Sequence, residues 1–167
     1  PAGTRVYITD IGTDSAETLT KAARRMHDLG YSPVPHFASR RLTTRDRLEA
    51  RVRMMTQEAG VTDVLVIGGG LDKPAGEFTS TMEVLETGLF DKFGIRQIGV
   101  AGHPEGSPDF SEAVAIAALR LKKEFGERTG ARMRIVTQFG FDAKVFIDWA
   151  EGLRNHGIDL PVHLGVA

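Results

Sequence analysis

An uncharged amide stands where a buried strand is expected to end, at Gln138 directly after Thr137. The residues before this pair, Ile135 and Val136, are apolar and β-branched, which is typical of a strand buried on both faces. The carboxyl ends of such strands are where ligands bind in α/β proteins. A Gln side chain offers one acceptor and two donors, so it suits a heterocyclic amide such as a pterin or a nicotinamide. The alternative is a strand-end glutamine that only caps its own loop.

Small and polar residues also follow the other runs that are expected to be strands. They are Thr9, Asp10, Gly12, His36, Gly68, Gly69, Gly70, Gly102, His103, Glu105, His163 and Gly165. Because ligands of parallel α/β proteins collect at the carboxyl ends of the strands, this distribution predicts a pocket there rather than a plain structural rim.

Three consecutive glycines, Gly68 to Gly70, follow the third of these runs. Glycine lets a backbone approach a flat ligand or a phosphate closely, because it has no side chain. The segment is not a dinucleotide fingerprint, since the G-x-G-x-x-G spacing is missing and no helix is expected to begin at the glycines. A flexible connector is the alternative interpretation.

Three histidines at strand ends, His36, His103 and His163, are of the type that holds the metal of a hydrolase. No H-x-H pair and no carboxylate at metal-ligand spacing accompanies them. We therefore favour hydrogen-bonding pocket residues over a metal centre, and keep the hydrolase as an alternative.

A group of cations, Arg120, Lys122 and Lys123, falls on one predicted helix whose opposite face is apolar. A solvated helix face is the ordinary interpretation of such a run. If the group lies near the mouth of the pocket, the same cations can hold a diphosphate.

Helical patterns separate the strand-like runs in strict alternation. The expected strands are residues 5–11, 31–37, 63–67, 95–101, 133–138 and 160–166, and the expected helices are residues 14–29, 43–59, 79–90, 111–128 and 142–156. This alternation predicts an α/β fold with a mostly parallel sheet. It fits an open doubly wound sheet or a (β/α)8 barrel of the TIM type, of which about three quarters would be present because a full barrel needs ~250 residues.

Composition narrows the class of protein. The chain has 167 residues, 41% of them hydrophobic, a net charge of −1 and no cysteine. This predicts one domain with its own core and gives no electrostatic reason to expect nucleic acid. No segment is apolar for about 18 residues, so no membrane span is expected. The absence of cysteine removes disulfides and thiol nucleophiles and fits a cytoplasmic protein.

Four segments resemble a known family. TQFGFD at 137–142 is similar to the T-Q-F-F-F-[DE] strand of 5,10-methylenetetrahydrofolate reductases, and VAGHPEGSP at 100–108 resembles their V-A-[GA]-Y-P-E-x-H-P segment. The dipeptide PH at 35–36 matches the end of an earlier strand, and Leu71 fits the R-G-D-L loop. The resemblance implies a single α/β domain over residues 1–167, the central part of a (β/α)8 barrel. Its first strand, with the family's proton-donating Glu, would precede residue 1, and its last strands would follow residue 167.

The family's chemistry implies roles for individual residues. It is hydride transfer from NAD(P)H through FAD to 5,10-methylenetetrahydrofolate, giving 5-methyltetrahydrofolate. By position, Gln138 would be the catalytic residue that contacts the pterin and the nicotinamide, with Phe141 and Asp72 also at the folate. The residues expected at the flavin are Thr9, His36, Gly68, Gly69, Gly70, Ser80 (or Thr79), His103, Ser107, Lys122 and Lys123. A homo-oligomer is compatible with the sequence.

The chain also departs from the family pattern at cofactor contacts. Gly68 and Gly70 replace the Arg that reaches the flavin phosphates and the Asp that tunes the flavin, and Asp72 is a possible substitute for the latter. The other changes are His103 for Tyr, Ser107 for His and Gly140 for an aromatic residue. These departures keep open a paralogue that binds folate without flavin, or that transfers hydride directly from the nicotinamide.

Overall fold

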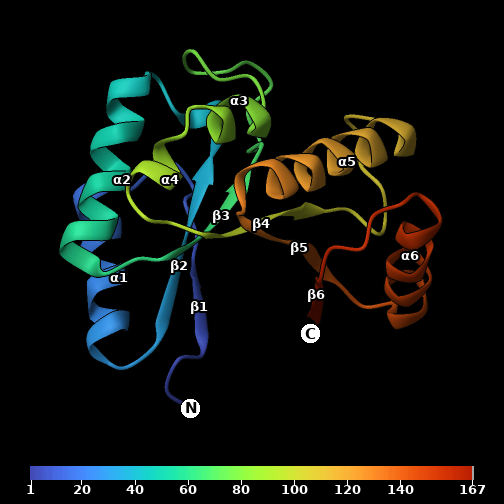
Figure 1. Ribbon diagram of the computed structural model, residues 1–167, viewed down its shortest axis with the longest axis horizontal. Helices are drawn as coiled ribbons and strands as arrows, with labels where there is room; N and C mark the ends of the chain where they lie inside the picture. The colour runs from blue at the N-terminus through green and yellow to red at the C-terminus, as the bar shows by residue number, and fades with distance from the viewer. Residues whose placement is uncertain (167) are drawn as a thin grey trace. The chain divides into compact units, whose positions relative to one another are not determined.

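Six strands alternate with helices in the computed structural model, which describes residues 1–166 (Figure 1). The strands follow one another in the sheet as they do in the chain, from β1 to β6. The pairs β1–β2, β2–β3 and β5–β6 are parallel. This is the order of successive units in a (β/α)8 barrel and not the permuted order of a doubly wound sheet. The predicted barrel-type fold is confirmed, with six strands of the pattern described; residue 167 of the predicted span lies outside the described residues.

The chain forms two compact units, residues 1–98 and the residues from Gly99 onward. The strands of the first unit are β1 (Arg5–Ile8), β2 (Ser32–Ala38), β3 (Asp63–Ile67) and the start of β4 (Gln97–Gly102). Its helices are α1 (Ala16–Asp28), the 3-10 turn η1 (Ser39–Arg41), α2 (Arg45–Ala59), α3 (Thr81–Glu86) and α4 (Leu89–Lys92).

Local signals in the sequence set the limits of the first two helices. The Ser15 hydroxyl accepts a hydrogen bond from the Thr18 N–H and begins α1, and the Thr44 hydroxyl caps α2 in the same way. Gly60 ends α2 with a φ of 63°, a left-handed conformation that glycine adopts without strain. Helix α1 packs on β2 and α2, and the core between these elements includes fully buried Phe37.

One helix prediction in this unit was wrong. Residues 79–90 were expected to form a single helix, and they form α3 and α4 instead. Gly88 lies between them with a φ of 70°, which interrupts the helical backbone. Ser80 begins α3 through a capping box, in which its side chain and that of Glu83 each accept a backbone N–H of the other residue.

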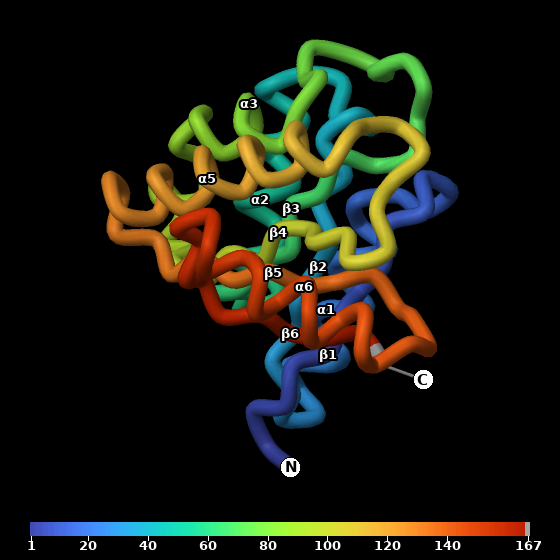
Figure 2. The backbone as a smooth tube through the Cα atoms, turned by 90° about the vertical axis from the view of Figure 1, so that its right-hand side faces the viewer, coloured from blue at the N-terminus to red at the C-terminus, as the bar shows by residue number. Residues whose placement is uncertain are grey.

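The second unit contains α5 (Glu112–Thr129), β5 (Arg132–Gly140), α6 (Ala143–Asn155) and β6 (Val162–Val166), which can be followed in Figure 2. Helix α5 ends at Gly130, whose φ is 74°, and α6 begins at Asp142, whose carboxylate accepts the N–H groups of Lys144 and Val145. Buried Ile135 and Phe146 lie in the core of this unit. Across the described chain, no helix combines the length and apolar character that a bilayer span requires.

Candidate functional site

A buried ion pair lies at the carboxyl end of β1. The Asp10 carboxylate is 2.7 Å from an Arg51 nitrogen, and the two side chains are only 7% and 11% exposed. Asp10 also accepts the Gly12 N–H, and Arg51 also donates to the His36 carbonyl at 2.8 Å. The Arg51 guanidinium lies 4.6 Å from the centre of the Phe37 ring. This pair therefore joins α2 to the ends of β1 and β2.

His36 carries an imidazole nitrogen with no protein partner. Its Nε2 is buried and makes no hydrogen bond with any described residue, and its ring meets the Tyr7 ring edge-on at 6.1 Å. Burial lowers the pKa of His36, and the neighbouring Asp10 charge opposes this only in part. The imidazole is thus neutral at neutral pH, and a bound ligand can supply the missing hydrogen bond.

The glycine loop after β3 leaves room for a ligand. A Cβ added at Gly68 or Gly70 would meet no atom within 4 Å, whereas one at Gly69 would lie 3.1 Å from the Ala38 Cβ. The loop is anchored and not a free connector, because the Arg40 guanidinium donates to the carbonyls of Leu71 and Thr79. These residues fit the close approach of a flat ligand or a phosphate to the backbone.

The other residues predicted at the flavin or folate in this unit have different surroundings. Thr9 and Asp72 are exposed. The Ser80 oxygen accepts the Glu83 N–H as a helix cap, and the Thr79 hydroxyl donates to the Glu83 carboxylate. The Ser80 oxygen therefore serves as the cap of α3, while its hydroxyl hydrogen can still be donated to a ligand.

A β-bulge shapes the end of β5. Val136 pairs with His163 and Phe139 with Gly165, so two residues of β5 lie opposite one residue of β6. A bulge of this kind bends the strand and changes the direction of a side chain, and bulges are common beside active sites. The two residues inside it are Thr137 and Gln138.

Thr137 and Gly165 hold the bulge together. The buried Thr137 hydroxyl oxygen accepts the Gly165 N–H at 2.8 Å. A Cβ on Gly165 would lie 2.8 Å from the carbonyl oxygen of Gln138, which is too close for any side chain. The absence of a side chain at 165 thus lets the two backbones approach where the bulge forms.

Gln138 itself projects from this bulge. It is exposed, and its carboxamide makes no hydrogen bond with any residue from 1 to 166. Next to it, the rings of Phe139 and Phe141 meet edge-on at 5.0 Å while remaining 57% and 83% exposed. An unpartnered amide beside an exposed aromatic pair can recognise a flat heterocycle by hydrogen bonds and by stacking.

His103, directly after β4, lies within electrostatic range of Lys122 on α5. Burial lowers the pKa of His103, and the positive charge of Lys122 lowers it further. Burial also lowers the pKa of Lys122 to about 8, although part of its side chain is accessible to solvent. The His103 ring meets Phe110 edge-on at 5.1 Å. An anion bound beside Lys122 would favour its charged form.

The remaining predicted cations and Ser107 make structural contacts. Lys123 donates to the Gly157 carbonyl and pairs with Asp159 at 3.0 Å, and Arg120 donates to the His156 carbonyl. The two side chains thus tie α5 to the segment that joins α6 and β6. The Ser107 hydroxyl accepts the Asp109 N–H within its own loop. Of the two lysines, only Lys122 is free of such contacts.

The family model of methylenetetrahydrofolate reductase matches residues 2–167. The chain belongs to this family. A segment of 70 residues is 41% identical to methylenetetrahydrofolate reductase 1 of Schizosaccharomyces pombe, which amounts to 41% of this chain and 11% of the yeast protein. The match therefore spans only about a tenth of that relative's length.

Gly140, where the methylenetetrahydrofolate reductase family has an aromatic residue, has a packing explanation. A Cβ at this position would lie 2.4 Å from the Phe146 ring and 3.4 Å from a carboxylate oxygen of Glu105. Phe146 is buried, so it fills the space next to β5 from α6. An aromatic side chain at 140 would therefore collide with Phe146 in this chain.

The metal-centre alternative gains no support. Within residues 1–166, no three His, Asp or Glu side chains are grouped in a way that could hold a metal ion. His163 has an interaction partner within the structure.

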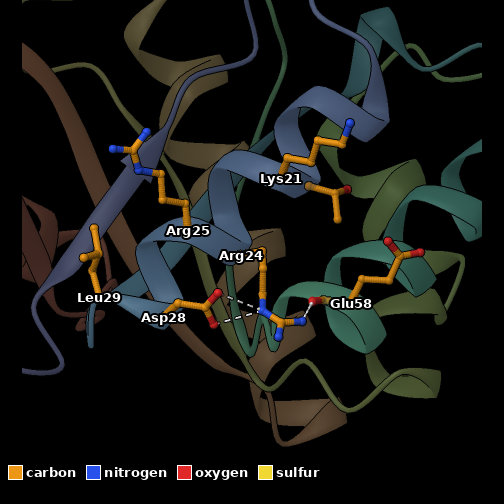
Figure 3. Close-up of a pocket in the computed structure, with 7 residues that line it drawn as sticks. Lys21, Arg24, Arg25, Asp28, Leu29 and Glu58 are labelled. Atoms are coloured by element: carbon orange, nitrogen blue, oxygen red, sulfur yellow. Dashed lines mark hydrogen bonds and ion pairs between the residues drawn. The ribbon is translucent and has the colours of Figure 1, made fainter.

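A surface hollow of about 430 Å³ lies away from the strand ends, between α1 and α2 (Figure 3). Its lining residues are Thr20, Lys21, Arg24, Arg25, Asp28, Leu29 and Glu58. Arg24 is bound to the Asp28 carboxylate and to the Glu58 carbonyl, as Figure 3 shows. The central Arg24 of the hollow is already bound to its neighbours, so the strand ends remain the candidate site.

Two features of the site were not predicted from the sequence: the Asp10–Arg51 pair and the bulge at Thr137 and Gln138. Arg51 lies on a helix 41 residues after Asp10, so no local pattern joins them. The bulge had one visible signal, a glycine at 165 inside an otherwise apolar strand.

Proposed function

We propose that this protein is an oxidoreductase that reduces 5,10-methylenetetrahydrofolate to 5-methyltetrahydrofolate. The proposal rests on family membership together with one observation, the exposed and unpartnered carboxamide of Gln138 in the bulge of β5. When bound, FAD would supply the chemistry of carrying a hydride from NAD(P)H to the folate-bound carbon. The residues of this chain would bind and orient the partners of that transfer.

In the second unit, Gln138 would donate to and accept from the pterin ring, because its carboxamide offers both kinds of atom. Phe141 and Phe139 would cover the ring or the benzoyl group of the folate by stacking. His103 and Ser107, with Lys122 as the cation, would contribute flavin contacts. Lys123 is the weaker candidate because it is already paired with Asp159.

In the first unit, the Nε2 of His36 would bond a polar atom of the flavin, since it is buried and lacks any other partner. Gly68, Gly69 and Gly70 would allow the cofactor to lie against the backbone. Thr9 and Ser80 are proposed to line the same cofactor, and Asp72 to approach the folate.

The decisive experiment compares the wild-type protein with Gln138→Ala. We expect the purified wild type to show the visible flavin absorption band and to oxidise NADH or NADPH in the presence of methylenetetrahydrofolate. Gln138→Ala should keep the flavin spectrum and lose about fivefold or more in kcat/KM, because a neutral hydrogen bond to substrate contributes about 1 kcal/mol or more. The matched control is Gln57→Ala, an exposed glutamine on α2. Equal kcat/KM values for the two variants would remove the role of Gln138.

Folate binding without flavin is the second candidate function. The observation that favours it is the pair of glycines at 68 and 70, which provide no side chain toward a cofactor. Calorimetry with tetrahydrofolate separates the two. Binding that Gln138→Ala weakens, with no flavin band and no NAD(P)H oxidation, would favour the binding protein. Stoichiometric flavin with turnover would favour the reductase.

A further inference from the structure

An arginine with no partner lies at the carboxyl ends of the strands in the first unit. Arg41 closes η1, directly after β2, and its side chain is half-buried. Among residues 1–166, its guanidinium makes no hydrogen bond and no ion pair. A guanidinium has five N–H donors, and a partly buried one without an acceptor is an incomplete arrangement.

The loop after β1 is shaped around this guanidinium. A Cβ added at Gly12 would lie 2.0 Å from an Arg41 terminal nitrogen and 2.9 Å from its central carbon. Gly12 has a φ of 85°, which other residues rarely adopt. The glycine therefore provides the space in which the Arg41 side chain lies against the backbone.

Two nearby arginines differ from Arg41 because their guanidinium groups donate to protein acceptors, although the Arg51 Nε itself has no partner. Arg40 donates to the carbonyls of Leu71 and Thr79, and Arg51 is paired with Asp10. The Asp10 carboxylate accepts the Arg51 guanidinium and the Gly12 N–H, and it makes no hydrogen bond with Arg41. Of these three arginines, Arg41 is the one whose guanidinium makes no hydrogen bond with a described residue.

The glycine loop lies beside the same turn. The Arg40 N–H donates to the Gly68 carbonyl at 2.9 Å, which places the loop next to η1. At Gly68 and Gly70 the space beyond the backbone is open. Bare backbone and a free guanidinium from adjacent loops are the two components that bind phosphate oxygens in proteins.

We propose that Arg41 binds the diphosphate of a dinucleotide cofactor and so supplies the cation that Gly68 cannot. This deepens the proposed function, on which it rests. The shared chemistry is the diphosphate, and either FAD or a nicotinamide dinucleotide can carry it. Arg41 would determine affinity for the dinucleotide form and would not contact the reacting atoms.

The test measures dissociation constants for FAD, riboflavin, NADH and NADPH with the wild type, Arg41→Gln and Arg47→Gln. Arg47 is an exposed arginine on α2, so its substitution changes the net charge equally. We expect Arg41→Gln to weaken one of the dinucleotides about tenfold to hundredfold, as for loss of a charge-assisted hydrogen bond. Riboflavin, which has no phosphate, should bind equally well to all three proteins. The dinucleotide that weakens identifies the source of the diphosphate.

Two further variants guard against a folding defect. Gly12→Ala would displace the Arg41 guanidinium while leaving its charge in place, and Arg41→Lys would keep the charge without the planar fork. We expect both to weaken the same dinucleotide, with circular dichroism and urea unfolding reporting on the fold. If the wild type binds the dinucleotides and Arg41→Gln weakens none of them, this inference alone is overturned. Failure of the wild type to bind any of the dinucleotides overturns it together with the reductase proposal.

Discussion

The two ends of the strands in the first unit are built differently. At the amino ends, the Arg5 guanidinium bonds the Asp63 carboxylate at 2.8 Å and the Gln97 side-chain oxygen at 2.9 Å, so the first residues of β1, β3 and β4 are joined. At the carboxyl ends, the Nε2 of His36 and the guanidinium of Arg41 have no partner among the described residues.

The same strands therefore carry groups that stabilise the fold at one end and groups that can bind a ligand at the other. Polar groups that satisfy one another stabilise the sheet but have nothing left to offer a ligand. Groups left unsatisfied weaken the fold slightly and are available to a ligand instead. In barrel-type folds the amino face serves stability and the carboxyl face carries the site, and the distribution of partners here follows that division.

Substitution at the amino end should have the largest effect on stability. Arg5→Met would remove the guanidinium that bonds the Asp63 carboxylate, whose side chain is only 1% exposed. We expect the free energy of unfolding to fall by about 1.5–3 kcal/mol, as for the loss of a hydrogen bond to a buried charged group. Urea unfolding measures the loss. Ligand dissociation constants at low temperature should not change.

The control for this substitution is Arg24→Met, because Arg24 and Asp28 form an exposed pair at 59% and 56% exposure. Its expected loss is below about 1 kcal/mol. If the two variants were equally stable, or if Arg5→Met altered ligand affinity, the proposed division between the two ends would be wrong.

Thr137→Val tests the bulge near the carboxyl end of β5. Unlike His36 and Arg41, Thr137 has a hydrogen-bond partner within the protein, the Gly165 N–H. The substitution removes the acceptor for the Gly165 N–H. It should lower the free energy of unfolding by about 1–2 kcal/mol, the cost of one buried, unsatisfied donor. Folate affinity should fall as well, because Gln138 would lose its support. Thr62→Val, at an exposed threonine, serves as the control in both chemical unfolding and calorimetry. If Thr137→Val loses stability but keeps its folate affinity, the bulge has no part in folate binding.

The stability of the protein should depend on pH through the partly buried His36 at the carboxyl ends of the strands. Because burial lowers the pKa of His36 below 6.5, the unfolded chain binds a proton more readily than the folded protein does. The contribution of His36 to stability is thus complete above pH about 6.5 and decreases as the pH falls below that value. His103 should act in the same direction. Urea unfolding from pH 7 to 5 should show a shallower pH dependence for His36→Gln than for His27→Gln, an exposed histidine.

The smallest effect on stability is expected for His36→Phe. The ring beside Tyr7 is kept, and the buried nitrogen without a partner is removed. The free energy of unfolding should change by less than about 1 kcal/mol, in either direction. Flavin affinity should nevertheless fall about tenfold, as measured by fluorescence titration. A stable variant with unchanged flavin affinity would show that the open nitrogen has no part in binding.

The strand and helix order was predictable because it depends on local patterns. Buried β-branched runs, the caps at Ser15, Thr44 and Asp142, and the glycine stop at Gly60 all act within a few residues of their own position. The break at Gly88 was missed because a glycine within a helical pattern only sometimes interrupts it.

Part of the site was predictable, because the sequence shows which strands are followed by polar residues. Gln138 is exposed at the end of β5, as the strand-end pattern indicated, while its role remains a prediction. The contact of Arg41 with Gly12 could not be predicted, since it depends on how two distant loops fold over each other. The bulge depends on the register of β6 against β5, which hydrophobic alternation in one strand does not determine.

The extra residue in β5 means that strand length, and not only side-chain identity, determines which way the Gln138 amide faces. Successive residues of a strand point to opposite sides. A single-codon deletion between Val136 and Phe139 would therefore restore even pairing with β6 and reverse the facing of the residues beyond it. In a relative whose strand is one residue shorter or longer at this point, the glutamine would still align with Gln138. Its side chain would nevertheless point to the opposite side of the sheet.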